Sequence, residues 1–218
     1  HTWQATATGE VGSDIIVDIP FANEPILGGT ADIRVAARIG GGMAVIKEYP
    51  AFDTIKGTNP SRAEIVAELG TDEYRAVCWQ ESKMLQFQSD GQPLPNGGHD
   101  GGFGLMQITK NPRPSPADLW NWKQNIGTGK AILEAAKIRS QTRVTYLNAH
   151  LNPLPQPPLE LTPDQHQLNA FAIYNAGTYY YAPRRIGQTS QYEWIPNPGS
   201  PVAVSYANSV KAFLTSKP

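Results

Sequence analysis

The sequence has a single cysteine, few charges and no long apolar run, and each of these scarcities excludes a class of protein. With Cys78 alone, the chain has neither an internal disulfide nor a cysteine cluster for zinc or iron–sulfur. Charged residues make up 17% of the chain, and 18 basic against 19 acidic side chains provide no field that favours nucleic acid. No apolar stretch approaches the roughly 18 residues that span a bilayer, so we expect no membrane span.

The residues that are abundant indicate a folded protein rich in loops. Hydrophobic residues make up 40% and aromatic residues 9%, which is enough for a core and argues against disorder. The 20 glycines and 19 prolines exceed average usage. The 218 residues allow one large domain, or one domain with an appendage. The chain opens at His1 with neither an initiator methionine nor a signal peptide, and we expect a processed protein or a piece of a longer one.

The first 55 or so residues carry the alternating pattern of β-strands. Ile33, Val35, Ala37 and Ile39 would share one face of a strand, and glycine clusters on both sides mark turns. We predict a β-rich N-terminal region over residues 1–58. It would either pack on the residues that follow or end a β domain that begins upstream.

Helical signals dominate residues 59–218, the second predicted domain. Ser61 and Glu64 have the spacing of a capping box, and Thr162, Pro163 and Gln165 form another helix start. The expected helices cover about residues 61–70, 71–84, 122–149 and 162–177, with a last helix from residue 200. Tryptophans 120 and 122 are expected to begin the long helix, and residues 86–104 and 178–199 to be loops.

Four segments that carry distinctive side chains follow one another along the second domain. They are Glu81-Ser82, Gly102-Phe103-Gly104-Leu105-Met106-Gln107-Ile108, the start of the long helix with Asn125 and Gly129, and Tyr174-Asn175-Ala176-Gly177 followed by Tyr206. Over residues 60–216 this order resembles the lysozyme-like superfamily, in particular goose-type lysozymes and soluble lytic transglycosylases. The resemblance implies an α+β, mainly helical lysozyme-like fold with a small N-terminal β region. It also implies cleavage of the β-1,4 bond between N-acetylmuramic acid and N-acetylglucosamine in peptidoglycan.

The resemblance makes Glu81 the general acid of this reaction. Glycoside cleavage needs an acid that protonates the departing oxygen, and this acid must keep its proton near neutral pH. Glu81 ends a predicted helix, where the helix dipole disfavours a negative charge, and it follows the apolar residues Cys78 and Trp79. Both features are expected to keep the Glu81 carboxyl protonated.

Five further residues are expected to contact the glycan, again by resemblance. They are Ser82, Gly104, Gln107, Tyr174 and Asn175. A glycine such as Gly104 lets a sugar approach the backbone, and Gln107 has an amide that matches an acetamido group. In the resembling enzymes the tyrosine at position 174 faces the acid. Met106 is interpreted as core, and Asn125 and Gly129 as helix packing without a chemical role.

The presence or absence of a second catalytic carboxylate distinguishes two possible reactions. An inverting hydrolase uses a carboxylate to position water, whereas a lytic transglycosylase uses the 6-hydroxyl of the substrate and forms a 1,6-anhydro sugar. Asp100, in the loop before residue 102, is the candidate for water positioning and therefore the second predicted catalytic residue. The goose-type pattern has a further aspartate just after the motif, where this chain has Thr109. Asp100 favours hydrolysis, and the alternatives are a solvated loop residue or Asp90 in the same role.

His99 is the remaining candidate for a chemical role. His99 neighbours Asp100, but Ser82 has no adjacent base and the other histidines share no metal-ligand spacing with it. We therefore interpret His99 as a loop residue and expect neither a metal nor another cofactor. The leading hypothesis is a lysozyme (muramidase), with a lytic transglycosylase second and a non-catalytic peptidoglycan-binding module third.

The expected partners are peptidoglycan glycan strands, with an immunity protein or a larger delivery polypeptide as further partners. The expected location is the periplasm or the extracellular space. This would suit an antibacterial effector that is secreted or delivered into a target cell.

Overall fold

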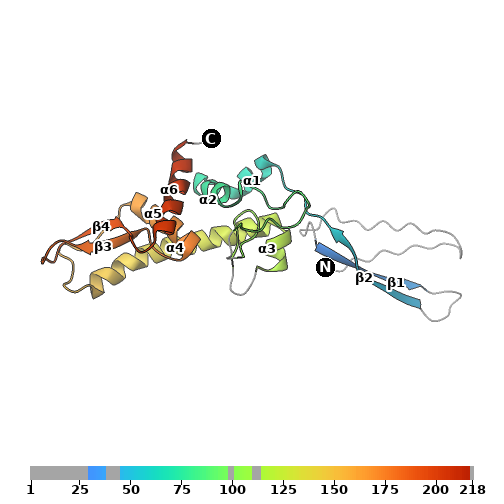
Figure 1. Ribbon diagram of the computed structural model, residues 1–218, viewed down its shortest axis with the longest axis horizontal. Coiled ribbons are helices and arrows are strands. Elements are labelled where there is room, and N and C mark those ends of the chain that lie inside the picture. The colour runs from blue at the N-terminus through green and yellow to red at the C-terminus, as the bar shows by residue number, and fades with distance from the viewer. Residues whose placement is uncertain (1–28, 38–44, 98–100, 110–113, 217–218) are drawn as a thin grey trace.

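The computed structural model of the chain describes residues 29–37, 45–97, 101–109 and 114–216 (Figure 1). The fold is α+β, with a mainly helical body and two antiparallel two-stranded hairpins. Along the chain the elements are β1 (Gly29–Ala37), β2 (Val45–Ile55), α1 (Arg62–Leu69), α2 (Asp72–Ser82), α3 (Pro116–Trp120), α4 (Trp122–His150), α5 (Pro163–Ala176), β3 (Tyr181–Arg185), β4 (Tyr192–Pro196) and α6 (Pro201–Ser216).

The N-terminal hairpin extends away from the helices (Figure 1). In the β1–β2 register Thr30 lies opposite Thr54 and Ala37 opposite Val45, which confirms strands in this part of the predicted β region. The side chain of Val35 on β1 is 48% exposed, so it is not buried against the helical body. The strands predicted nearer the N-terminus, at residues 2–8 and 14–19, lie outside the described residues.

Local capping fixes the ends of the helices that the sequence predicts. At α1 the Ser61 hydroxyl accepts from the Glu64 N–H, and the Glu64 carboxylate accepts from the Ser61 N–H at 2.8 Å. Thr162 and Gln165 make the same capping box at α5, which ends at Gly177 in the left-handed conformation. The predicted capping box at Ser61 and the predicted helix start at Thr162 are therefore confirmed.

Two local predictions are wrong. Trp120 does not begin the long helix: it ends α3, a short helix that Pro116 opens at its first turn, and Asn121 then caps α4. Residues 178–199 are not wholly a loop, because they contain the β3–β4 hairpin. Pro183 lowers the strand propensity of β3, but in a two-stranded sheet both strands are edges and tolerate a missing N–H donor.

The core lies where α2, α4, α5 and α6 meet. It contains Cys78, Met106, Phe171 and Val210, all fully buried. The long helix α4 runs along the body, and α6 packs against both α2 and α5 (Figure 1). Within the described ranges, no helix combines the length and apolar character that a bilayer crossing needs.

Candidate active site

The predicted motif at residues 102–108 forms a buried turn, closed by a bridge between Phe103 and Ile108. Two buried amide side chains hold its N–H groups. The Gln86 Oε1 accepts from the Leu105 N–H at 3.0 Å, and the Asn125 Oδ1 accepts from the Met106 N–H at 2.8 Å. The Asn125 role corrects the expectation of simple helix packing. Both amides also donate to carbonyls at the end of α3, so the turn and α3 form one unit.

Two hydroxyl groups hold the carbonyl side of the same turn. The Ser82 hydroxyl at the end of α2 donates to the Leu105 carbonyl at 2.8 Å. The Tyr174 hydroxyl at the end of α5 donates to the Met106 carbonyl at 2.6 Å. The turn therefore joins the ends of α2 and α5. It also gives Ser82 and Tyr174 protein partners, in addition to the glycan contacts predicted for them.

The glycines near the turn allow close packing of protein groups. Gly104 has φ +77°, and a Cβ there would lie 2.5 Å from the Gln86 Oε1 and 2.6 Å from the Asn125 Nδ2. This packing explains Gly104 without the sugar approach that its sequence position suggested. On α4, a Cβ at Gly129 would lie 2.5 Å from the Met106 Cβ. Gly129 therefore lets α4 contact the turn.

Glu81 lies in the last turn of α2, partly exposed, next to the end of the helix. The Tyr206 hydroxyl of α6 donates a hydrogen bond to its carboxylate. Directly after α2, Lys83 and Met84 have φ values of +56° and +65°, which non-glycine residues seldom adopt. This sharp turn ends α2 and leads the chain to the buried Gln86.

The phenols around Glu81 are donors rather than bases. Burial, and then the nearby Glu81 carboxylate, raise the pKa of Tyr174 well above its usual range. The same causes, with the hydrogen bond to Glu81, raise the pKa of Tyr206. Burial raises the pKa of Cys78 to about 12, so its thiol stays protonated as well. At neutral pH the Tyr174 and Tyr206 hydroxyls and the Cys78 thiol are therefore protonated.

An aromatic pair includes Trp79, which precedes Glu81 by two residues on α2. Trp79 on α2 stacks on Phe213 of α6, with ring centroids 5.6 Å apart. The Lys83 ammonium lies 5.4 Å from the centre of the Trp79 ring and the Arg62 guanidinium 5.2 Å from it. The end of α2 therefore carries an aromatic ring with two cations beside it, and the apolar surroundings expected for Glu81 remain a prediction.

Gln107 has a positive φ, and one of its two side-chain polar atoms makes no hydrogen bond with the described residues. Its φ is +44°, and its Nε2 donates to the Gly104 carbonyl at 2.9 Å. Its Oε1 is buried without a hydrogen-bond donor among the described residues. A buried acceptor without a donor costs about 1–3 kcal/mol, so a donor from a ligand or water would be favourable here. The predicted contact between Gln107 and an acetamido N–H remains a prediction.

The structure brings five predicted site residues to one place: Glu81 and Ser82 on α2, Gly104 and Gln107 on the turn and Tyr174 on α5. Asn175 lies exposed in the last turn of α5. Asp100 and His99 lie outside the described residues. The sequence analysis assigned no role to Tyr206. The feature that could have identified it is its position after the Tyr174-Asn175-Ala176-Gly177 segment in the order of motifs. Gln86 was assigned no role either, because a glutamine in a polar loop has no distinctive pattern.

Two surface hollows flank α6. One, of about 610 Å³, lies along its outer side between Pro196 and Ala212. The other, of about 400 Å³, lies between α1, α2 and the end of α6 and is lined by Arg62, Arg75 and Phe213 among others. Neither set of lining residues includes Glu81. No cluster of three metal-ligating side chains occurs in the part of the chain that the structure describes.

Comparison with known proteins identifies no relative. The chain matches no family model, no curated protein and no solved structure. The residues of the site therefore carry the functional proposal.

Proposed function

We propose that the chain is a peptidoglycan glycosidase of the lysozyme type, which hydrolyses the β-1,4 bond between N-acetylmuramic acid and N-acetylglucosamine. The observation that carries this proposal is the hydrogen bond from Tyr206 to Glu81 at the end of α2. This end of α2 is joined through Ser82 to the 102–108 turn, whose Gln107 has a buried free acceptor. A carboxyl that a hydrogen bond holds in position is what general acid catalysis of glycoside cleavage requires.

In this mechanism Glu81 acts as the general acid. Its carboxyl donates a proton to the glycosidic oxygen while the bond from that oxygen to the sugar carbon breaks, and the glutamate is left as a carboxylate. Tyr206 keeps its own proton, because its pKa is raised, and its hydroxyl donates to the carboxylate that forms. A hydrogen bond to a charged group is stronger than one to a neutral group, so Tyr206 would stabilise Glu81 after proton transfer.

The group that attacks the sugar decides between two products. In the hydrolase, Asp100 accepts a proton from a water that attacks the face opposite the departing sugar. In a lytic transglycosylase, the 6-hydroxyl of the muramic acid attacks instead and returns its proton to Glu81. The contact to Tyr206 favours this second candidate, since a phenol donor suits a single carboxyl that serves first as acid and then as base. Hydrolysis stays first because the sequence supplies Asp100.

The place of action follows from the substrate. A peptidoglycan glycosidase works where the cell wall is, in the periplasm or outside the cell, and we propose this location for the chain. A delivery polypeptide and an immunity protein would be its partners if it acts as an antibacterial effector. The β1–β2 hairpin, which projects from the helices, would be the point of attachment to a delivery polypeptide (Figure 1).

The direct test compares the wild-type protein with Glu81→Gln on purified peptidoglycan. We expect the substitution to lower the release of soluble muropeptides about 10³-fold, because the amide has no proton to donate. Sedimentation with insoluble peptidoglycan should be retained. Glu68→Gln, at an exposed position on α1, is the matched control and should leave release unchanged.

The outcomes separate enzyme from binding module. Retained release by Glu81→Gln would remove Glu81 from the acid role. A wild-type protein that sediments with peptidoglycan but releases nothing would be a glycan-binding module. A protein that neither binds nor releases would contradict both functions.

A further inference from the structure

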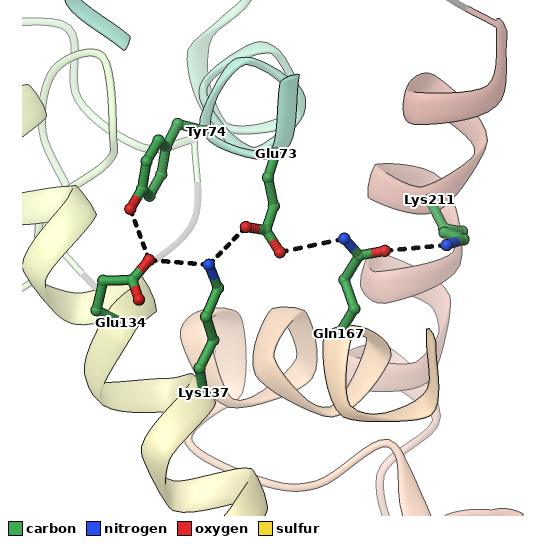
Figure 2. A network of polar contacts seen from close by, with 6 residues as sticks. All are labelled: Glu73, Tyr74, Glu134, Lys137, Gln167 and Lys211. Atoms are coloured by element: carbon green, nitrogen blue, oxygen red, sulfur yellow. Dashed lines mark hydrogen bonds and ion pairs between the residues drawn. The ribbon is translucent and has the colours of Figure 1, made fainter. Parts of the chain in front are cut away.

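A network of polar contacts joins four helices on one side of the body (Figure 2). The Lys137 ammonium of α4 lies 2.6 Å from one carboxylate oxygen of Glu73 on α2 and 2.8 Å from Glu134. The other oxygen of Glu73 accepts from the Gln167 Nε2 of α5 at 3.2 Å. The Gln167 Oε1 accepts from the Lys211 ammonium of α6 at 2.9 Å. One neutral side chain, Gln167, thus connects α2 to α6.

These contacts are better shielded from water than ordinary surface ion pairs. The Glu73 side chain is 18% exposed, and those of Lys137 and Lys211 are 31% and 30% exposed. Burial lowers the pKa of Lys137, but its hydrogen bonds to Glu134 and Glu73 outweigh this effect and leave the pKa raised. Lys137 therefore stays charged. Partly buried pairs of this kind hold their geometry more firmly than exposed pairs.

Three of these four helices, α2, α5 and α6, also carry residues of the candidate active site. On α2, Glu81 follows Glu73 by eight residues, about 12 Å of helix. On α5, Tyr174 follows Gln167 by seven residues, which is two turns, so both lie on one face. On α6, Tyr206 precedes Lys211 by five residues, about 7 Å. The network thus bridges α2, α5 and α6 within about two helical turns of the point where Glu81, Tyr174 and Tyr206 gather.

We propose that Gln167 is a positioning residue, whose bridge between Glu73 and Lys211 sets how α2 and α6 lie against α5 and thereby holds Tyr206 at Glu81. A hydrogen bond with a charged acceptor tolerates little displacement, so a small slide of α6 along α2 would break it. The catalytic consequence rests on the proposed glycosidase function. The geometric consequence, the contact between Tyr206 and Glu81, is independent of it.

The test uses Gln167→Met, which keeps the length of the side chain and removes both hydrogen bonds. The full chain is labelled with ¹³C at tyrosine Cζ, and the Tyr206 resonance is assigned by its loss in Tyr206→Phe. We expect this resonance to shift in Gln167→Met. We also expect kcat for peptidoglycan to fall about tenfold with KM within about twofold, because a small misplacement near the reacting groups lowers turnover.

The control is Gln188→Met in the exposed turn between β3 and β4, which should change neither the resonance nor kcat. A merely structural role for Gln167 predicts a lower unfolding midpoint with an unchanged Tyr206 resonance, and this result would overturn the proposal. If the wild type shows no turnover, the glycosidase function fails. The resonance would then still decide whether Gln167 positions Tyr206.

A second pair of variants keeps the proposal testable if Gln167→Met does not fold. Gln167→Glu places a carboxylate against Glu73 and should shift the Tyr206 resonance. Adding Glu73→Gln exchanges the two groups, so that an amide and a carboxylate again face each other and Lys211. We expect the double variant to recover about half or more of the wild-type kcat, together with the wild-type resonance. No recovery relative to Gln167→Glu would overturn the bridge.

Discussion

Tyr206, in the middle of α6, donates its hydroxyl hydrogen to Glu81, which lies 125 residues earlier at the end of α2. The contact unites two segments that the sequence places at opposite ends of the helical region. Because its pKa is raised, the Tyr206 phenol keeps its proton at neutral pH and is the donor in this contact. The proposed chemistry follows from this relationship.

Replacing Tyr206 by phenylalanine removes the donor and keeps the ring. We expect Tyr206→Phe to lower kcat on peptidoglycan about 10- to 100-fold, because a hydrogen bond to a charged group contributes about 1.5–3 kcal/mol. Steady-state release of reducing ends measures this change. Tyr146→Phe, at a tyrosine that is 53% exposed on α4, is the control. Equal loss in both variants, or none in Tyr206→Phe, would contradict the role of Tyr206.

Asn125 is expected to be a main determinant of stability. Asn125→Leu leaves the Met106 N–H and the Phe103 and Asp118 carbonyls without this partner. Unsatisfied buried groups are costly, and we expect the free energy of unfolding in urea to fall by about 3 kcal/mol. The control, Gln124→Leu at the neighbouring exposed position, should change it by less than about 0.5 kcal/mol. Similar effects of the two substitutions would contradict this assignment.

Two glycines on α4 should respond in opposite directions to alanine. A Cβ at Gly129 meets Met106, so Gly129→Ala should destabilise the protein by about 1–2 kcal/mol. At Gly127 nothing lies within 4 Å of the added Cβ, and Gly127→Ala should stabilise the helix by about 0.5–1 kcal/mol. Thermal unfolding of both variants measures the difference. A stabilising Gly129→Ala would mean that α4 does not contact the turn as closely as described.

Cys78 makes stability depend on pH in the alkaline range. Burial raises its pKa from 9.0 to about 12, so above pH 9 the unfolded chain loses the thiol proton while the folded chain keeps it. Stability from this group is therefore fully present below pH 9 and decreases up to about pH 12, by about 1.4 kcal/mol per pH unit. Cys78→Ala should flatten the decline in unfolding free energy between pH 9 and 10 by about this slope. Identical slopes would show that Cys78 is not buried.

Features that depend on neighbouring residues were predictable from the sequence. The capping boxes at Ser61 and Thr162 and the end of α5 at Gly177 each involve groups three to four residues apart. The β3–β4 hairpin was missed for the converse reason. Its pairing joins Tyr181 to Pro196 across a turn, and a proline-rich strand carries no clear alternation.

The candidate site was predictable only in part. Glu81 and Gln107 belong to segments with a recognisable order, which identified them without any knowledge of their contacts. The contacts that hold the turn come from Gln86 and Asn125, each 19 residues from its partner, and the contact to Glu81 comes from Tyr206. Amides and phenols at such separations carry no local signature. Their roles therefore emerge only when the packing of α2, α4 and α6 is known.

The most direct measurement is mass spectrometry of the soluble products that the wild-type protein and Asp100→Asn release from purified peptidoglycan. We predict products that end in reducing N-acetylmuramic acid. Asp100→Asn should form them about 10²-fold more slowly, because water then lacks its carboxylate. Products lighter by one water, the 1,6-anhydro sugars, would contradict hydrolysis and assign a lytic transglycosylase. The absence of any soluble product from the wild-type protein would contradict glycan cleavage at Glu81 altogether.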